Sequence, residues 1–518
     1  MTETSTGPRA SRPSTPDLLT DLPADVIGPD DIRYDPMTSG ENLRFVALPD
    51  QFRLCRTAEH VREALQSAVA EGKRVTVQSG GHCGEAFVSE PRPDVVLDLS
   101  RMAAVGFDTA RQAFLIEPGA TIGRVYRELF VNWGVTIPGG TCVGVGAGGH
   151  ICGGGLGPLS RLFGLTVDHL EAVEVVVVRA DGRAEVVVAT GADDDPHQDL
   201  FWAHTGGGGG NFGVVTKYWM RTPGATGGPS DLLPRPPRRL HLARMRWPWA
   251  EMTEAAFTRL VGNFSAWQVA NSGVDTPYAG VYSYLECLHR DAADVTLTTQ
   301  VVADDPGSTR VLEDFLATVN EGVGITPTSV RHTLPWLDAT WYVTPADTGP
   351  AAIAVRRKVK SADLRGTHTP EQVAAVWRHL TTPDFDGLGY IEYMGYGGRV
   401  NAVAPTATAR VQRSTTLKTF YNIMWTDPAN DDKNIRWLQE FYREVHAETG
   451  GVPVPGEVNT GAYLNYPDID LADPAWNTSG VPWHELYYGE NYPRLQRVKA
   501  RYDPLNVFNH ALSVRLPE

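Results

Sequence analysis

The stretch that organises the chain is Gly139–Gly157, GGTCVGVGAGGHICGGGLG. It places one reactive side chain, Cys142, ahead of a run of glycines. Glycine lacks a Cβ atom and adopts positive φ, so the peptide N–H groups of such a run can come close to a flat or anionic ligand. A second stretch, Ser79-Gly80-Gly81-His82, has the same character, with glycines beside one nucleophile. The two stretches together predict a single ligand that is bound by both of them.

Length, charge and hydropathy limit the classes of protein that need to be considered. A chain of 518 residues favours two domains. The net charge of −15 argues against a general nucleic-acid-binding protein, which needs a basic face. The sequence contains no apolar run of about 18 residues, so we expect no membrane span. The polar N-terminus lacks the apolar core of a secretory signal, which favours a cytoplasmic location.

The first half of the chain mixes strands and helices. A helix is predicted from Thr57, which can cap it, up to Gly72, which can end it. A second helix is predicted over residues 121–133. Buried strands are expected at residues 75–77, 94–100, 113–119, 170–180 and from Val214 onward, with Gly206–Gly210 forming a further loop for close approach. This half is therefore α+β.

The second half follows a Pro/Gly-rich break at residues 222–237, which is the best linker candidate. Alternating strands at residues 278–288 and 415–425 mix with amphipathic helices, one starting at Thr369-Pro370 and one over residues 430–448. A short basic helix is expected over residues 491–500. Because this half lacks glycine ligand loops, we expect it to cover the substrate.

The glycine stretch formally contains a dinucleotide-binding fingerprint, from Gly144 to Gly149. That interpretation requires a strand before it, a helix after it, and an acidic residue at the end of the next strand. The following residues, HICGGGLG, are poor helix formers, and Asp168 precedes the next strand instead of ending it. A Rossmann domain is therefore not predicted.

Three interpretations of His82 and Cys142 remain. With His150, Cys152 and Cys83 they could bind zinc, but paired Cys-x-x-Cys motifs are missing, so no metal site is predicted. Each could be a packed loop residue, and for either residue alone this is the better interpretation. Alternatively, each could attack an electrophilic ring carbon and hold a cofactor covalently.

Five motifs resemble the berberine-bridge-enzyme-like flavin oxidases: SGGHCGE, GGTCVGVGAGGHICGGGLG, TGGGGGNFGVVT, YLNYPD and YYGENYPRLQRVKARYDPLNVF. They occur in order over most of residues 40–518. Within the family, the chain is most similar to actinobacterial oxidases that tailor secondary metabolites, among them the hexose oxidases of glycopeptide biosynthesis. The resemblance implies an FAD domain of the type shared with vanillyl-alcohol oxidase and p-cresol methylhydroxylase.

The resemblance also implies roles for individual residues. His82 matches the histidine joined to the flavin 8α-methyl, and Cys142 matches the cysteine joined to flavin C6. Tyr466, the second tyrosine of YLNY, matches the proposed catalytic base of alcohol-oxidising members. Other positions match residues that line the cofactor, namely Ser79, Gly80, Gly81, Cys83, Gly146, Gly148, Gly149, Gly153, Gly154, Gly209, Asn211, Val215, Asn491 and Asn506.

Two positions depart from the family pattern. Several relatives have tyrosine where this chain has Leu156, and the usual arginine before SGGH is Gln78. Leu156 removes a hydroxyl from the substrate pocket, to which Tyr463 is also expected to contribute. A mechanism with two tyrosines therefore cannot be transferred unchanged.

The sequence thus predicts an α+β flavoprotein of two domains. We expect a tail at residues 1–30 that is disordered or loosely attached, an FAD-binding domain at 31–222, an α/β substrate domain with an antiparallel sheet at 223–460, and a segment at 461–518 that returns to the FAD domain. The expected reaction is oxidation of a hydroxyl on a bulky, glycosylated metabolite, with O2 as acceptor and H2O2 as product. Oligosaccharide oxidation and oxidative cyclisation or desaturation are the alternatives. The oligomer is expected to be a monomer or a homodimer.

Overall fold

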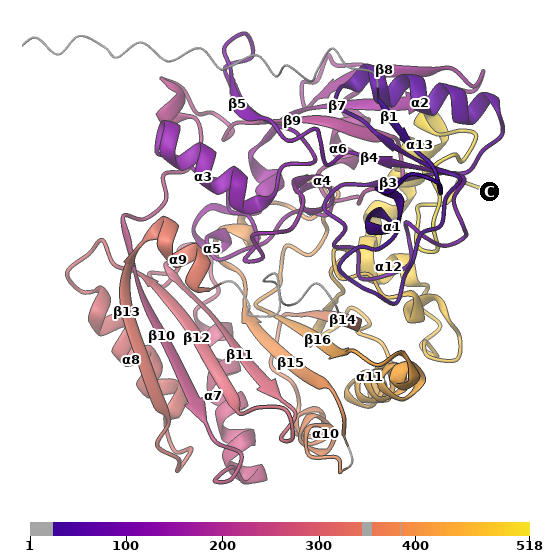
Figure 1. Ribbon diagram of the computed structural model, residues 1–518. Helices are drawn as coiled ribbons and strands as arrows, with labels where there is room; N and C mark the ends of the chain where they lie inside the picture. Colours follow the sequence, from indigo (N-terminus) through magenta and orange to yellow (C-terminus); the bar gives the residue numbers. More distant parts are fainter. Residues whose placement is uncertain (1–23, 344–354, 384) are drawn as a thin grey trace, which may run out of the picture.

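The computed structural model describes residues 24–343, 355–383 and 385–518, and it has two halves that meet along one interface (Figure 1). Most of the tail predicted at residues 1–30 lies outside the described residues. Its last part differs from the prediction, because Asp25–Ile27 forms strand β1 and pairs antiparallel with β2 (Gln51–Leu54). Ile27 is fully buried, so residues 25–27 belong to the folded first half and not to a loose tail.

The first half contains a small sheet with the strand order β1-β2-β4-β3. Strands β2, β4 (Val95–Asp98) and β3 (Val75–Gln78) run parallel. Helix α2 (Ala58–Ala70) leads from β2 to β3, and Thr57 caps it by accepting a hydrogen bond from the His60 N–H. Gly72 follows with a φ of +65°, as expected of a glycine that ends a helix. The predicted helix and strands are confirmed here.

A five-stranded antiparallel sheet completes the first half, with the order β5-β6-β9-β7-β8. Its strands are β5 (Val105–Asp108), β6 (Ala113–Ile116), β9 (Val214–Met220), β7 (Leu170–Val178) and β8 (Ala184–Thr190). Helix α3 (Ile122–Trp133) starts at the capping residue Thr121 and ends at Gly134. The remaining short helices of this half are α1 (Tyr34–Met37), α4 (Ala147–Cys152), α5 (Ser160–Phe163) and α6 (Gln198–Ala203).

Helix α4 (Ala147–Cys152) corrects part of the expectation that HICGGGLG, residues 150–157, makes no good helix, because its second half extends over residues 150–152. Each glycine in a helix interior costs about 1 kcal/mol relative to alanine. Here close packing overrides this propensity, since a Cβ atom at Gly148 would lie 3.0 Å from both Pro118 Cβ and Ser79 Oγ. The helix is six residues long. The chain around it belongs to the antiparallel sheet, so the rejection of a Rossmann domain agrees with the structure.

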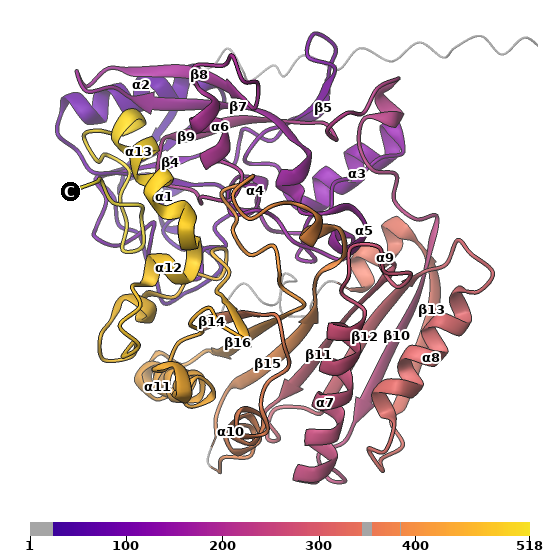
Figure 2. The same ribbon diagram turned by 180° about the vertical axis from the view of Figure 1, so that it is seen from behind.

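The second half is built on an eight-stranded antiparallel sheet, with the order β13-β10-β12-β11-β15-β16-β14-β17. Helices α7, α8, α10 and α11 cover one face of this sheet (Figure 2). The predicted α/β domain with a helix-covered antiparallel sheet is thus confirmed. The strands are β10 (Arg239–Trp247), β11 (Val281–Leu288), β12 (Val295–Val302), β13 (Thr328–Pro335), β14 (Arg356–Leu364), β15 (Leu388–Gly395), β16 (Leu417–Trp425) and β17 (Asn459–Gly461).

The helices of this half begin with capping residues where the sequence supplies them. They are α7 (Glu254–Ala270), α8 (Ser308–Asn320), α9 (Trp336–Tyr342), α10 (Pro370–Leu380) and α11 (Asp431–Val445). Thr369 forms a capping box with Gln372 at the start of α10, as its sequence predicts. Short 3₁₀ helices join the elements at Thr166–His169, Pro229–Asp231, Gly398–Ala402, Pro428–Asn430, Ala447–Thr449, Ile469–Ala472 and Gly489–Asn491.

The C-terminal segment returns to the first half, where α13 (Tyr492–Tyr502) packs on α6 (Figure 1). Lys499 of α13 donates a hydrogen bond to the carbonyl oxygen of Asn211 at 2.9 Å and pairs with Asp503 at 2.5 Å, with all of its side chain buried. Helix α12 (Trp483–Tyr488) precedes it. The chain therefore crosses twice between the halves, and the expected boundary at residue 460 falls inside β17.

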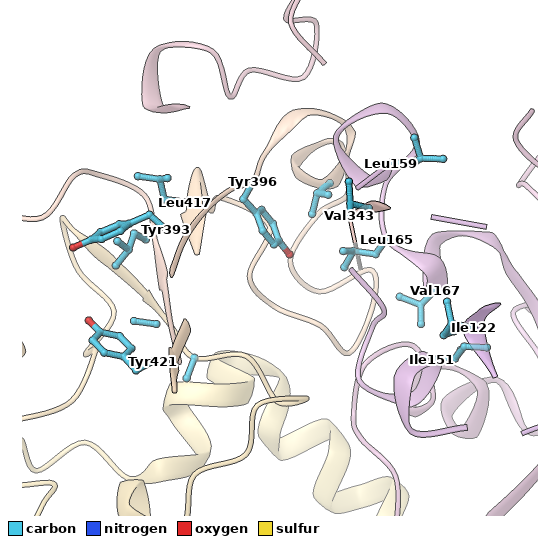
Figure 3. Packing of buried hydrophobic residues seen from close by; sticks show 14 of the residues in the cluster. Ile122, Ile151, Leu159, Leu165, Val167, Val343, Tyr393, Tyr396, Leu417 and Tyr421 are labelled. Carbon is cyan, nitrogen blue, oxygen red and sulfur yellow. The ribbon is translucent and has the colours of Figure 1, made fainter. Parts of the chain in front are cut away.

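One hydrophobic core runs through the interface between the halves. It includes Ile122, Ile151 and Leu165 of the first half and Tyr393, Tyr396 and Leu417 of the second (Figure 3). Close-packed side chains leave few voids and resist sliding. The two halves are therefore fixed relative to each other, and residues from both can form one site.

Candidate active site

A cavity of about 400 Å³ lies where the halves meet. Both glycine stretches line it, together with the C-terminal YLNYPD segment and one face of the large sheet. A volume of this size is typical of a cofactor or small-molecule site. His82, Cys142 and Tyr466 all line this same cavity, although they come from three distant parts of the sequence.

The two glycine stretches meet backbone to backbone. A Cβ atom at Gly80 would lie 2.4 Å from the Gly146 nitrogen, and one at Gly146 would lie 2.6 Å from the Gly80 nitrogen. Real Cβ atoms do not approach so closely, so glycine is required at both positions. This contact brings His82 near the loop after Cys142, since His82 Nε2 lies 3.5 Å from where a Gly144 Cβ would stand.

Other glycines face open space instead. A Cβ atom at Gly149 or Gly209 would meet no atom within 4 Å, although both residues line the cavity. The packing of the chain itself therefore does not explain glycine at these positions. Without a side chain at Gly149 and Gly209, a flat ligand can lie directly against the backbone at these positions.

Most of the predicted lining residues meet at this cavity. Besides the two nucleophiles and Tyr466, the cavity is lined by Ser79, Gly80, Gly81, Cys83, Gly146, Gly148, Gly149, Leu156, Gly209, Asn211, Val215 and Tyr463.

Four predicted positions lie outside the cavity lining. A Cβ atom at Gly153 would overlap the side chain of Asn465, so this glycine makes room for YLNYPD instead of for a ligand. Gly154 faces the side chain of Arg410. Asn491 is buried and donates to the carbonyl oxygens of a neighbouring loop, at Pro405 and Thr408.

Asn506 is the fourth of these positions. It is exposed, with a φ of +52°, in the turn after α13. Asn509 and His510, just beyond this turn, line the cavity in its place. The C-terminal motif thus identified the segment that reaches the cavity, but it did not identify the two residues of that segment that line it. Burial lowers the pKa of His510 to about 3, so this side chain is neutral.

The large sheet contributes a row of side chains that sequence reasoning missed. These are Tyr282 and Glu286 on β11, Tyr390, Glu392 and Met394 on β15, and Lys418 and Phe420 on β16. They alternate along each strand, as expected for one face of a sheet. The pattern with period two is visible in the sequence, but which face meets the cavity depends on pairing between distant strands.

Tyr466 lies inside a cluster of aromatic rings around one lysine. The Lys418 Nζ atom lies 4.1 Å from the centre of the Tyr466 ring and 4.2 Å from that of Tyr463. Phe420 packs on Tyr466 with ring centres 4.3 Å apart. Asn465 fixes the segment by donating to the His150 carbonyl oxygen at 3.0 Å. The cluster holds the phenol of Tyr466 and the amine of Lys418 in direct contact at the cavity wall.

Burial gives Lys418 an unusual charge state. Loss of hydration lowers the pKa of this fully buried amine to about 7. Nearby Asp363 and Glu392 oppose the shift, whereas the charge of Arg410 adds to it. Lys418 therefore exchanges a proton near neutral pH, in contact with the Tyr466 ring.

Among the described residues, we find no group of three or more His, Cys, Asp and Glu side chains arranged to bind a metal ion. In the same part of the chain, no helix has the length and apolar character that a membrane crossing requires.

Comparisons with known proteins agree on the type of cofactor. Residues 49–187 match the model of an FAD-binding domain, and residues 462–515 match the model of berberine and berberine-like proteins. The chain is 51% identical to the aclacinomycin-N/aclacinomycin-A oxidase of Streptomyces galilaeus over 489 residues, which cover 94% of this chain and 89% of that one.

Solved structures show the same likeness in three dimensions. A flavoenzyme involved in shunt product recycling in caerulomycin biosynthesis is 58% identical, with a TM-score of 0.94 over 96% of this chain and 100% of the other. A glycopeptide hexose oxidase complexed with teicoplanin is 48% identical, with a TM-score of 0.91 over 95% and 99% of the two chains.

Proposed function

Because this chain belongs to the berberine-bridge-enzyme-like FAD-dependent oxidases, which act on sugars or natural products, we propose a particular reaction for it. It oxidises a hydroxyl group of a bulky, glycosylated secondary metabolite and uses O2 as acceptor, giving H2O2. The observation that carries this proposal is the contact between Lys418 and Tyr466 beside the two nucleophiles of the cavity.

We propose that His82 and Cys142 hold the FAD covalently, through its 8α-methyl group and its C6 atom. Both residues line one cavity, and the contact between Gly80 and Gly146 fixes their loops together. Gly149 and Gly209 leave the room that a flat ring system needs. Residues 31–222 with 461–518 would form the FAD-binding domain, and residues 223–460 the domain over the substrate.

FAD supplies the acceptor for the hydride that leaves the substrate carbon. The protein must remove the hydroxyl proton, and we assign this step to Tyr466. An unperturbed tyrosine has a pKa of about 10 and is a poor base at neutral pH. A neighbouring cation favours the phenolate, and Lys418 places its ammonium over the ring.

Leu156 changes the substrate side of the pocket compared with relatives that have tyrosine there. It packs against a cluster of Tyr282, Tyr284 and Met394 from the large sheet. Tyr282 lines the cavity, and burial raises its pKa well above the usual value, so its hydroxyl stays a neutral donor. We propose that Tyr282 supplies the hydrogen bond to substrate that position 156 cannot.

The names of the relatives guide the choice of substrates. They include an aclacinomycin oxidase and an enzyme complexed with teicoplanin. The test is therefore a panel of glycosylated natural products, with their aglycones and the free sugars as controls. We expect glycosides to bleach the flavin without O2 and to consume O2 with release of H2O2. Bleaching by none of the glycosides, but by free oligosaccharides alone, would contradict the proposed substrate class.

A further inference from the structure

His82 has a partner that none of the sequence motifs pointed to. Its Nδ1 atom lies 2.7 Å from Glu41 Oε2, and Arg357 Nη2 lies 3.1 Å from Glu41 Oε1. The side chains are only 21% (His82), 14% (Glu41) and 11% (Arg357) exposed. All three line the cavity, so a largely but not fully buried carboxylate connects the histidine to an arginine from the opposite half of the molecule.

The backbone around Glu41 is built to hold this carboxylate against the histidine loop. The Glu41 N–H donates to the Gly81 carbonyl oxygen at 2.9 Å, one residue before His82. A Cβ atom at the preceding residue, Gly40, would lie 2.4 Å from that same oxygen. Only glycine allows the two loops to approach this closely, so the position of Glu41 is fixed relative to His82.

Asn42 completes this arrangement. Its Nδ2 group donates to the carbonyl oxygens of Gly84 at 3.2 Å and Arg357 at 3.0 Å, and its Oδ1 accepts from the Arg357 N–H at 3.0 Å. One buried amide therefore joins the Glu41 loop, the histidine loop and strand β14. Side chains locked by such a network keep a defined geometry.

Glu41 carries a persistent negative charge beside His82. Burial alone would raise the pKa of this carboxyl, but the hydrogen bond with His82 and the positive charge of Arg357 outweigh it and lower the pKa below its usual value. Glu41 is therefore an anion at neutral pH. An anion in contact with one imidazole nitrogen orients the ring and stabilises positive charge on it.

We propose that Glu41 is the positioning residue that holds the imidazole of His82 and accepts its proton while His82 becomes bonded to FAD. This inference rests on the covalent attachment proposed above. The new N–C bond replaces one N–H bond of His82 and one C–H bond of the 8α-methyl group. The two electrons that are released reduce the flavin ring, and O2 takes them up to give H2O2. The proton accepted by Glu41 and the proton lost by the methyl group balance the two protons that O2 takes up as it becomes H2O2.

The experiment compares E41Q, E41D and the wild type, all purified with FAD. After denaturation and digestion, mass spectrometry measures the fraction of the His82 peptide and of the Cys142 peptide that carries flavin. Loss of a positioned proton acceptor slows such a step by about 100-fold or more. We expect E41Q to keep flavin on Cys142 and to carry little on His82, with attachment appearing slowly on incubation with FAD. E41D keeps a carboxylate and should restore much of the attachment.

A matched control is E171Q, which makes the same change in another carboxylate of the first half that pairs with an arginine, Arg221, but that lies outside the cavity lining; it should leave His82 fully flavinylated. Full attachment to His82 at the wild-type rate in E41Q would overturn the inference. Equal loss of both linkages in E41Q and E41D, with lowered melting temperatures, would also overturn it, because the residue would then serve folding alone. A wild type without flavin on His82 would instead refute the covalent attachment itself.

Discussion

At the scale of single residues, the reaction depends on the phenol of Tyr466. We expect Tyr466→Phe to keep its FAD and to lose about 10²-fold to 10⁴-fold in the rate of flavin bleaching by substrate, since a positioned base contributes that much. Stopped-flow absorbance under anaerobic conditions measures this rate. Tyr463→Phe is the matched control, and it should retain most of the rate. Bleaching of Tyr466→Phe at the wild-type rate would assign the base elsewhere.

The pH dependence of the same rate reports on Lys418. The Lys418 Nζ atom lies 4.1 Å from the centre of the Tyr466 ring, and its pKa of about 7 means that this amine loses its proton near pH 7. Above that pH the neutral amine can take up the proton that Tyr466 accepts from the substrate. We expect the bleaching rate to rise with pH through about 7 and then to level off.

In Lys418→Met the ammonium is missing, and the rise should move to more alkaline pH. The rate at neutral pH should fall with it. Met394→Leu, on the neighbouring strand, changes the cavity wall without changing a charge and should keep the wild-type profile. A rise near pH 7 that persists in Lys418→Met would show that another group titrates there.

How far the sequence predicted the site can be judged from these residues. His82, Cys142 and Tyr466 stand in recognisable motifs, and the structure brings them to one cavity. Lys418 and Glu41 stand in no motif, because their roles arise from contacts between residues far apart in the sequence. Pairing of distant strands and loops cannot be read from local periodicity, so these two residues were missed.

At the scale of elements, glycines decide how the loops meet. Gly146→Ala forces a Cβ atom against the backbone of Gly80, and such overpacking costs about 1–3 kcal/mol. We expect a lower melting temperature and loss of covalent flavin, because the loops that carry His82 and Cys142 are pushed apart. Thermal unfolding and flavin absorbance of the denatured protein measure the two effects.

Gly149→Ala is the matched variant in the same helix, where a Cβ atom meets nothing within 4 Å. Its stability should equal or exceed that of the wild type, since alanine is the better helix former. Its flavin content should nevertheless fall, because the added methyl group occupies space proposed for the ring. Unchanged flavin content in Gly149→Ala would mean that the ring lies elsewhere in the cavity.

Among the elements, capping residues and β-branched runs predicted their helices and strands well. Thr57, Thr121 and Thr369 each cap the helix expected after them. The failure was α4, in which Gly148 packs into a tight space beside Ser79 and Pro118 that admits no larger residue. The low helix propensity of glycine does make such a helix costly. It could not reveal the close packing around Gly148 that offsets this cost.

At the scale of the whole molecule, a buried ionic cluster joins three parts of the chain. Lys358 pairs with Glu85 at 2.5 Å and with Asp468 at 2.9 Å, and Lys360 pairs with Asp470 at 2.6 Å. Glu85 follows the histidine loop, the lysines lie on β14, and Asp468 is two residues after Tyr466. The cluster thus ties the proposed base to the proposed flavin loop.

Removing one partner leaves a buried charge without compensation, at a cost of about 3–5 kcal/mol. Lys360→Met should therefore lower the melting temperature strongly. The exposed Lys433, which lies 3.7 Å from Asp386, is the control, and its change to methionine should stay within about 0.5 kcal/mol. Equal melting temperatures for the two variants would show that the cluster does not hold the molecule together.

The central claim is that one imidazole and one thiolate from separate loops hold the same flavin. The most direct measurement is protease digestion of the denatured wild-type protein, followed by mass spectrometry of the yellow fraction. We predict a single species in which one FAD joins the peptide with His82 to the peptide with Cys142. Free FAD after denaturation, or flavin on neither of these two peptides, would contradict the account.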